Sequence, residues 1–201
     1  LSQTSKWFYS YADKAGLPYD FLDGYAKISL LTEGGSKVNF FGFSFNDKVA
    51  YPSIATYKWN SYGGGLSFMF LPRNSNILID GNVAYSGYKM SMIENTNPDR
   101  VSGINDLNIG MNCAYLLGKN TLSYGVTIQA SWIDYHFTSA YGWNIAEQTF
   151  NSELSVYLKD KWITCKEKLI IEPSFRLHIF ASQSVVSPEP RLAIKYNITK
   201  D

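Results

Sequence analysis

Apolar and polar residues alternate along much of the chain in runs of about ten residues. Small or polar residues separate the apolar positions of two successive runs, which are Leu107, Ile109, Met111, Cys113 and Tyr115, and then Leu122, Tyr124, Val126, Ile128, Ala130 and Trp132. Because successive side chains on a β-strand point to opposite faces, this pattern predicts long strands with one apolar face and one polar face.

Turn residues divide the chain into ten expected strands. These are residues 6–11, 21–32, 37–46, 57–70, 76–91, 104–116, 121–137, 149–162, 169–181 and 189–198. Gly34, Pro72, Gly118 and Lys166 mark tight turns, and longer loops are expected at the opposite strand ends. Short turns on one rim and long loops on the other are typical of outer-membrane barrels. The expected fold class is all-β, an antiparallel up-and-down transmembrane β-barrel.

Strand length, aromatic residues and charges favour lipid as the partner of the apolar face. Several expected strands exceed the roughly nine to eleven residues that cross a bilayer at a barrel's tilt. The polar face carries charges of both signs, and Glu172 is expected to pair with Arg191 on the neighbouring strand. Aromatic residues near strand ends are expected to form girdles at the membrane interfaces: Trp59, Tyr62, Tyr85, Tyr88, Trp132, Tyr135, Tyr141, Trp143, Tyr157 and Trp162.

Composition excludes some other classes. The chain of 201 residues has a formal net charge of +1, which offers no basis for nucleic-acid binding. No run approaches the roughly 18 apolar residues that a transmembrane helix requires. Cys113 and Cys165 form no disulfide framework and are both expected to be unpaired.

Five segments, in their order and spacing, resemble the barrel of Bacteroidetes TonB-dependent receptors. The segment 17–27 resembles the opening of a barrel strand in those receptors, and segments 40–47 and 59–66 resemble the strands that follow it. The segment Tyr-Leu-Lys-Asp-Lys-Trp at 157–162 and the segment Pro-Glu-Pro-Arg-Leu-Ala at 188–193 resemble two further signatures of the family. Together the segments extend over residues 5–198.

The resemblance implies a nutrient-uptake receptor in a bacterial outer membrane, with a barrel of about 22 strands and a plugged lumen. Residues 1–201 would then be a partial barrel domain without the plug domain, and the chain would be a fragment. The implied partners are the lipid bilayer, the remaining strands and plug of the receptor, TonB and an unidentified nutrient.

Candidate ligand-binding residues lie around the loop that follows the seventh expected strand. Asp134, His136, Tyr141 and Trp143 offer rings and polar groups that can stack on or hydrogen-bond a sugar or another polar nutrient. Packing within the girdle and loop is the plainer interpretation of the same residues. His136 and His178 have no metal-ligand spacing, so no metal or other cofactor is expected.

No nucleophile–base arrangement is evident, so the chain is not expected to be an enzyme. Two alternatives remain open. One is a ten-stranded outer-membrane protease or lipase, which requires catalytic groups clustered on one rim. The other is a soluble β-sandwich that binds or adheres, which requires strands packed in two layers.

Overall fold

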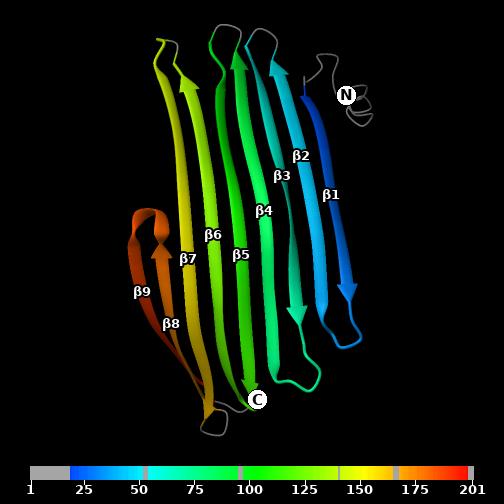
Figure 1. Cartoon of the computed structure of the whole chain (residues 1–201), viewed down its shortest axis with the longest axis vertical. Coiled ribbons are helices and arrows are strands. Elements are labelled where there is room, and N and C mark those ends of the chain that lie inside the picture. Colours follow the sequence, from blue (N-terminus) through cyan, green and yellow to red (C-terminus); the bar gives the residue numbers. More distant parts are fainter. Residues whose placement is uncertain (1–18, 52–53, 95–96, 140, 165–167, 199–201) are drawn as a thin grey trace.

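The computed structural model contains nine antiparallel strands in one sheet, arranged in the order of the chain (Figure 1). It describes residues 19–51, 54–94, 97–139, 141–164 and 168–198. The strands are β1 (Tyr19–Leu31), β2 (Lys37–Tyr51), β3 (Ala55–Phe70), β4 (Ile77–Glu94), β5 (Arg100–Leu117), β6 (Asn120–Thr138), β7 (Asn144–Thr164), β8 (Leu169–Phe180) and β9 (Val185–Tyr196). A short 3-10 turn, η1 (Ala181–Gln183), connects β8 to β9.

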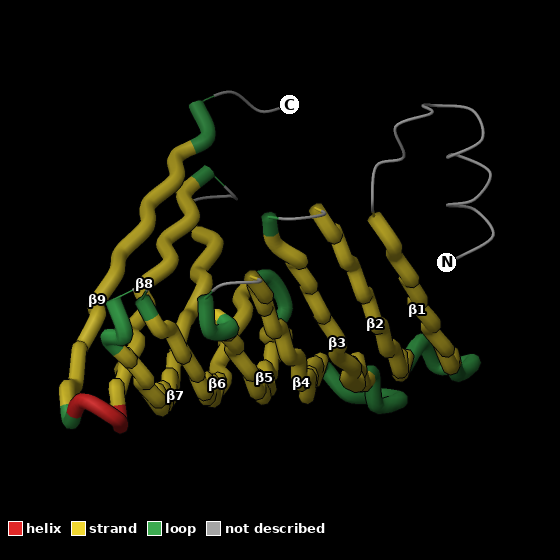
Figure 2. Tube along the Cα trace, turned by 90° about the horizontal axis from the view of Figure 1, so that it is seen from above, coloured by secondary structure: helices red, strands yellow, loops and turns green. Residues whose placement is uncertain are grey.

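The sheet curves into an open arc with β1 at one end and β9 at the other (Figure 2). This arrangement confirms the expected all-β, up-and-down antiparallel fold. The described strands form one layer, so the alternative of a two-layer sandwich is wrong. Nine strands are seen instead of ten because the expected strand at 6–11 lies outside the described residues.

Strand pairing sorts the side chains into the two predicted faces. Ile109 of β5 is opposite Ile128 of β6, and the next pair, Asn108 with Gln129, points to the other side. Extended across all nine strands, the register places one face on the convex side of the arc and the other on the concave side. The alternation in the sequence is therefore an alternation between the convex and concave sides.

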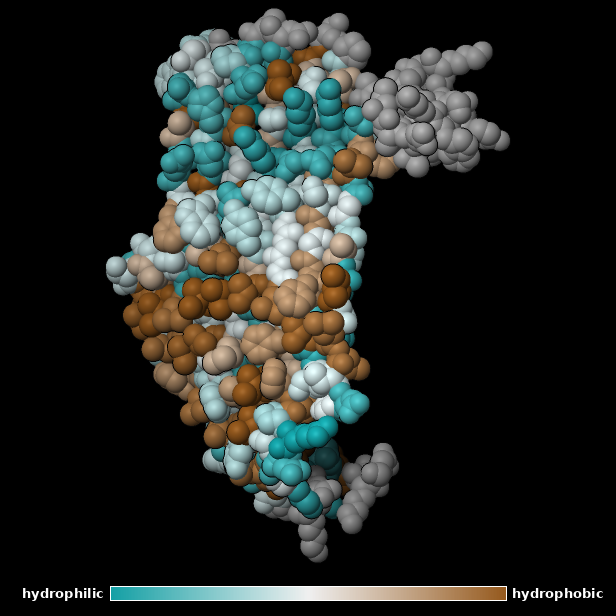
Figure 3. Space-filling model, turned by 45° about the vertical axis from the view of Figure 1, so that its right-hand side comes forward, coloured by the Kyte–Doolittle hydropathy of each residue, from teal (hydrophilic) through white to brown (hydrophobic). Residues whose placement is uncertain are grey.

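Hydrophobic side chains form a band across the convex face, below a hydrophilic region (Figure 3). At the upper edge of the band the register aligns Tyr62, Asn105 and Trp132. At its lower edge it aligns Tyr115 with Leu122. Most large apolar residues of this face are exposed, as Val83, Ile128 and Leu158 illustrate. The apolar surface thus faces the surroundings and not a protein core.

The prediction that connections would be short on one rim and long on the other is wrong. Only three residues separate β2 from β3, and five separate β6 from β7. The segments expected to be long loops are continuations of the strands, such as residues 47–51 of β2 and 144–148 of β7. Beyond the apolar band the convex face becomes polar, while the concave face carries rings such as Tyr51, Tyr57 and Trp59, so the strands continue after the alternation that revealed them has ended.

The predicted aromatic girdle is correct in part. Tyr62, Tyr85, Trp132 and Trp162 have the register of the convex face. Residues with the register of the concave face are Trp59, Tyr88, Tyr135 and Tyr157. The difference follows from residue parity along each strand, which decides the face that a ring covers.

Prolines explain two local features of the last hairpin. Pro173 lies in β8 opposite a gap in the β7–β8 ladder, which passes from Lys159–Ser174 to Trp162–Ile171. Proline has no N–H to donate to a ladder. Pro188, which was expected in a loop, lies within β9 at the end of the described sheet, as does Pro190. Their equal parity places both missing N–H groups on the same edge of β9, and edge strands tolerate proline.

Within the described part of the chain, no helix has the length and hydrophobicity needed to cross a membrane. Cys113 is buried and free, as expected, while Cys165 lies outside the described residues.

Candidate functional site

The concave side of β7, β8 and β9 carries a concentration of charged side chains. Because residues of the same parity share a face, the strands bring these side chains to one surface although they are far apart in sequence. The register places the following residues together: Glu153, Lys159 and Lys161 from β7, Glu172, Arg176 and His178 from β8, and Glu189, Arg191 and Lys195 from β9. This group is called the concave charged cluster below.

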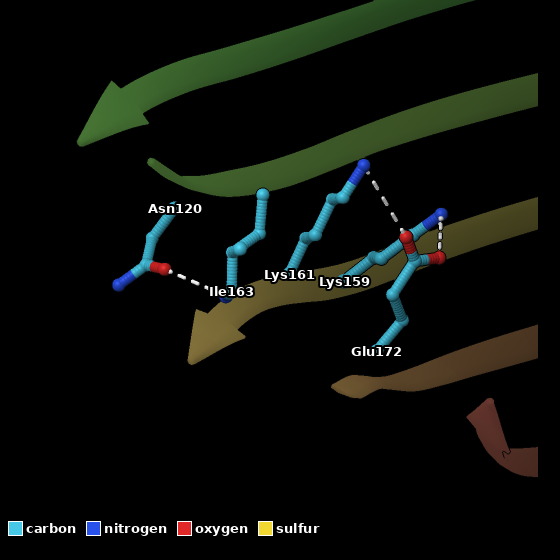
Figure 4. A network of polar contacts seen from close by, with 5 residues as sticks. All are labelled: Asn120, Lys159, Lys161, Ile163 and Glu172. Atoms are coloured by element: carbon cyan, nitrogen blue, oxygen red, sulfur yellow. Dashed lines mark hydrogen bonds and ion pairs between the residues drawn. The ribbon is translucent and has the colours of Figure 1, made fainter. Parts of the chain in front are cut away.

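Glu172 lies between two lysines of the neighbouring strand (Figure 4). Its Oε2 is 2.8 Å from Nζ of Lys159, and its Oε1 is 3.8 Å from Nζ of Lys161. Beyond this pair, the backbone N–H of Ile163 donates to Oδ1 of Asn120 at 3.0 Å, linking β7 to the start of β6. One carboxylate thus bridges two lysines near the lower end of the sheet and offsets part of their positive charge.

The expected pair of Glu172 with Arg191 does not form. The residue opposite Glu172 in β9 is Ala193, whereas Arg191 lies opposite Ser174. Arg191 instead contacts Glu189 of its own strand, with 2.6 Å between Nη2 and Oε2. Arg191 does not reach Glu172 because Lys159 and Lys161 flank Glu172 from β7 and engage both of its carboxylate oxygens.

A shallow hollow on the concave side lies among these charges. Its polar lining comes from Tyr157 and Lys159, from Ser174 and Arg176, and from Arg191. The Arg176 side chain is exposed and has no ion-pair partner among the described residues. Three cationic groups around one hollow, with Glu172 as the acid in its lining, can attract small anions from a water-filled space.

His178 has the polar role expected for a residue of this face. Its Nε2 lies 3.1 Å from Oε2 of Glu153, and its ring stacks on Phe180 with 4.2 Å between ring centroids. The described residues contain no group of three or more His, Cys, Asp or Glu arranged to hold a metal ion. The expectation that the chain needs no cofactor stays a prediction.

Side-chain hydrogen bonds to amide and carboxylate oxygens continue the polar surface across β4, β5 and β6. Asn112 donates to Oδ2 of Asp80 at 2.9 Å, and Asn82 donates to Oδ1 of Asn108 at 2.6 Å. Ser131 donates to the carboxylate of Asp106. These contacts join neighbouring strands, so the polar concave face is a connected network of hydrogen bonds.

The four predicted ligand-binding residues lie elsewhere. Asp134 and His136 have the register of the convex face, above the level of Trp132. Oδ1 of Asp134 accepts a hydrogen bond from Gln148 at 3.3 Å. Tyr141 and Trp143 lie in the connection between β6 and β7, with 91% and 74% of their surface exposed. The structure thus brings Asp134 and His136 to one face, and the ligand role of the four residues stays a prediction.

Sequence reasoning missed the lysine pair on either side of Glu172. The signal was present, because Lys159 and Lys161 have equal parity and therefore share a face. What was missing was the pairing of β7 with β8, which sets Lys159 opposite Ser174 and brings Lys161 within reach of Glu172.

No family model and no curated protein matches this chain. Among solved structures, it is similar to the β domain of the Bordetella autotransporter BrkA, with 11% sequence identity and a TM-score of 0.41. The similarity covers 88% of this chain and 76% of that domain. At such an identity a likeness concerns fold alone.

The expected function, as part of a TonB-dependent receptor for nutrient uptake, is contradicted by this comparison. The barrel that was found belongs to an autotransporter, a different type of outer-membrane protein. The segments behind the earlier resemblance are short aromatic, glycine and proline patterns, which long antiparallel strands and their turns favour in any barrel. No comparison tests the partners that the resemblance implied, which are the plug, TonB and a nutrient.

Proposed function

We propose that this chain forms a membrane-spanning wall of a β-barrel in a bacterial outer membrane. The convex face meets lipid, and the concave face borders a water-filled interior. The function of such a wall is to carry a hydrated, charged surface across the bilayer, where water and small ions can contact it.

The height of the apolar band carries the proposal. On β6, Trp132 at the upper edge of the band lies ten positions after Leu122 at the lower edge. At about 3.3 Å per residue and a strand tilt of about 40°, this length corresponds to a height of about 25 Å. That value matches the apolar belt of transmembrane barrels, which is also about 25 Å tall.

The concave charged cluster supports the assignment of water to the interior. Glu153 and Arg176 lie well inside the stretch of strand that the band covers, at the levels of Gln129 and Gly125 of β6, and both side chains remain accessible. Charges in contact with lipid near the middle of a bilayer are costly, so they face protein or water in membrane proteins. The convex face over the same stretch is apolar, which gives the two faces opposite solvents.

The direction of the strands supports a ring with more than the nine described strands. In an up-and-down sheet β1 and β9 run in the same direction, so a direct contact between them would be parallel. Lipid leaves no backbone edge unpaired. An all-antiparallel ring therefore needs an odd number of further strands between β9 and β1.

Two neighbouring substitutions on β5 test the proposal. Ile109 points to the convex face near mid-height of the band, and Asn108 points to the concave face. We expect Ile109→Arg to impair insertion into lipid vesicles by about 2–4 kcal/mol, the cost of an arginine on the lipid face at the midplane. Asn108→Arg should insert almost as well as the unmodified protein.

The readout is the fraction of protein that stays with vesicles after extraction at alkaline pH. Equal losses for Ile109→Arg and Asn108→Arg would contradict the assignment of faces. Unmodified protein that remains soluble without lipid or detergent would contradict the membrane role itself.

A further inference from the structure

Three lysines gather on the convex face directly above the aromatic edge of the apolar band. Lys48 of β2 is opposite Lys58 of β3, and Lys89 of β4 is opposite Asn60 of β3. All three side chains are exposed. Register and parity place them on the same side as Tyr62, which lies two residues from the Lys89 level and four from the Lys58 level.

The placement of these lysines is electrostatically unfavourable without a counter-ion. Like charges directly opposite each other on neighbouring strands destabilise a sheet. On the convex face of β1–β4 above Tyr62, the one acid among the described residues is Asp20, opposite Lys48. Three lysines against one aspartate leave this surface with a positive charge.

Polar groups and a hollow accompany the lysines. Asn46 and Asn60 are hydrogen-bonded to each other between β2 and β3. Together with Lys48 and Lys58 they line a hollow that also includes Asp20 and Asp47. The surface therefore offers cationic groups and amide donors side by side, which is the chemistry that binds phosphate.

We propose that Lys48, Lys58 and Lys89 bind the phosphate groups of anionic lipids at the membrane surface. The inference rests on the proposed function, because the apolar band sets the depth of the lysines. At about 3.3 Å per residue and a tilt of about 40°, the lysines lie about 5–10 Å above the Tyr62 level. The headgroup layer of a bilayer extends to about that height, since it adds about 5–7 Å to each side of the hydrocarbon core.

The test measures lipid binding by native mass spectrometry of the protein in detergent micelles. Phosphatidylglycerol, phosphatidylcholine and inorganic phosphate are titrated separately. We expect the unmodified protein to retain phosphatidylglycerol in preference to phosphatidylcholine. Lys58→Gln/Lys89→Gln should bind phosphatidylglycerol at least about tenfold more weakly, because each lysine near an anionic surface contributes about 1 kcal/mol.

The matched control is Lys27→Gln/Lys37→Gln, which removes the same charge from the concave face of β1 and β2. It should bind phosphatidylglycerol like the unmodified protein. Equal weakening in both double variants, or no preference between the two lipids, would overturn the proposal. Competition by inorganic phosphate at equal concentration would reassign the lysines to a soluble ligand and would also overturn it.

Insertion into vesicles distinguishes this proposal from the proposed function. Both double variants should insert as well as the unmodified protein, because no changed residue lies in the apolar band. Protein that inserts but shows no lipid preference would overturn the lysine site alone. Protein that fails to insert would overturn the membrane role from which the site was inferred.

Discussion

The ring of Tyr157 in β7 covers Gly125, its partner in β6. A Cβ atom on Gly125 would lie 2.6 Å from Cε1 of Tyr157 and 2.7 Å from the backbone oxygen of Met111. The hydroxyl of Tyr157 extends past β6 and donates to Oδ1 of Asn112 in β5 at 2.9 Å. A glycine in the middle strand thus allows a side chain to connect the strands on either side of it.

The same relationship predicts the effect of Gly125→Ala. The added methyl group meets a backbone oxygen that cannot move without bending β5, so we expect a loss of about 1–3 kcal/mol in the free energy of unfolding. Urea unfolding in detergent micelles, followed by circular dichroism, measures it. Gly103→Ala is the control, because its Cβ would lie 3.5 Å from the nearest atom, the backbone oxygen of Tyr88. Equal losses would contradict the prediction.

Replacement of Glu172 by Gln should weaken the sheet slightly and in a salt-dependent way. Lys159 and Lys161 lose their shared counter-charge, but both are exposed enough for water to screen them. We expect a loss of at most about 1 kcal/mol in the free energy of unfolding. It should largely disappear in 1 M salt, where the screening length is about 3 Å.

Unfolding of Glu172→Gln in low and high salt provides the measurement. Glu189→Gln is the matched control, because Glu189 contacts Arg191 within its own strand and joins no two strands. Its effect should be smaller. A loss for Glu172→Gln that is the same at both salt concentrations would show that packing, and not charge, is responsible.

Two tyrosines on the convex face share one acceptor. The hydroxyls of Tyr62 and Tyr85 lie 3.3 Å and 3.1 Å from Oδ1 of Asn105. Asn105→Ala removes both hydrogen bonds and should cost about 1–2 kcal/mol of unfolding free energy. Adding Tyr62→Phe and Tyr85→Phe to that variant should cost almost nothing more, because their acceptor is already absent.

Thermal unfolding of the single and combined variants tests this shared contact. Tyr115→Phe is the control, since Tyr115 has the register of the same face at the lower edge of the band. Tyr115→Phe should leave the stability unchanged, both in the unmodified protein and in the Asn105→Ala variant. Additive losses in the combined variant would mean that the tyrosine hydroxyls do not depend on Asn105.

Chemical labelling should reveal the two faces of β6 residue by residue. With Cys113 and Cys165 replaced by alanine, single cysteines are introduced at Val126, Thr127, Ile128 and Gln129. In lipid vesicles, a charged, membrane-impermeant maleimide should modify the cysteines at 127 and 129 and leave those at 126 and 128 largely unmodified. The reason is that the even positions face the apolar surroundings.

In unfolded protein all four positions should react alike, which controls for the intrinsic reactivity of each thiol. Labelling of positions 126 and 128 at the same rate as 127 and 129 in vesicles would contradict the assignment of lipid to the convex face.

Local periodicity predicted the strands and their two faces. The alternation from Leu107 to Trp132 identified β5 and β6, and residue parity separated their apolar face from their polar face before any pairing was known. The same parity placed Asp134 and His136 with Trp132 on the convex face. Asp134 and His136 were grouped with Tyr141 and Trp143 as a loop site because the four are close in sequence. The strand face on which Asp134 and His136 lie was not considered.

Features that depend on pairing between strands could not be predicted from the periodicity of residues along each strand. The partners of Glu172 depend on which residues of β7 and β9 lie beside it, and that register is a property of the whole sheet. The continuation of β2 to Tyr51 likewise depends on the ladder with β3, because the convex face there carries Lys48 and no longer the large apolar residues that mark the strand in the sequence. The contact of Tyr157 with Asn112 needs two strand pairings and the glycine between them.

By itself, the sequence determined that this chain forms long two-faced strands, because alternation with period two is a local property of neighbouring residues. Only the tertiary structure decided which charges meet, where the strands end and how Lys48, Lys58 and Lys89 come together above the apolar band. Those outcomes depend on the register and curvature of the sheet, which arise from hydrogen bonds between strands and not from the order of residues within one strand.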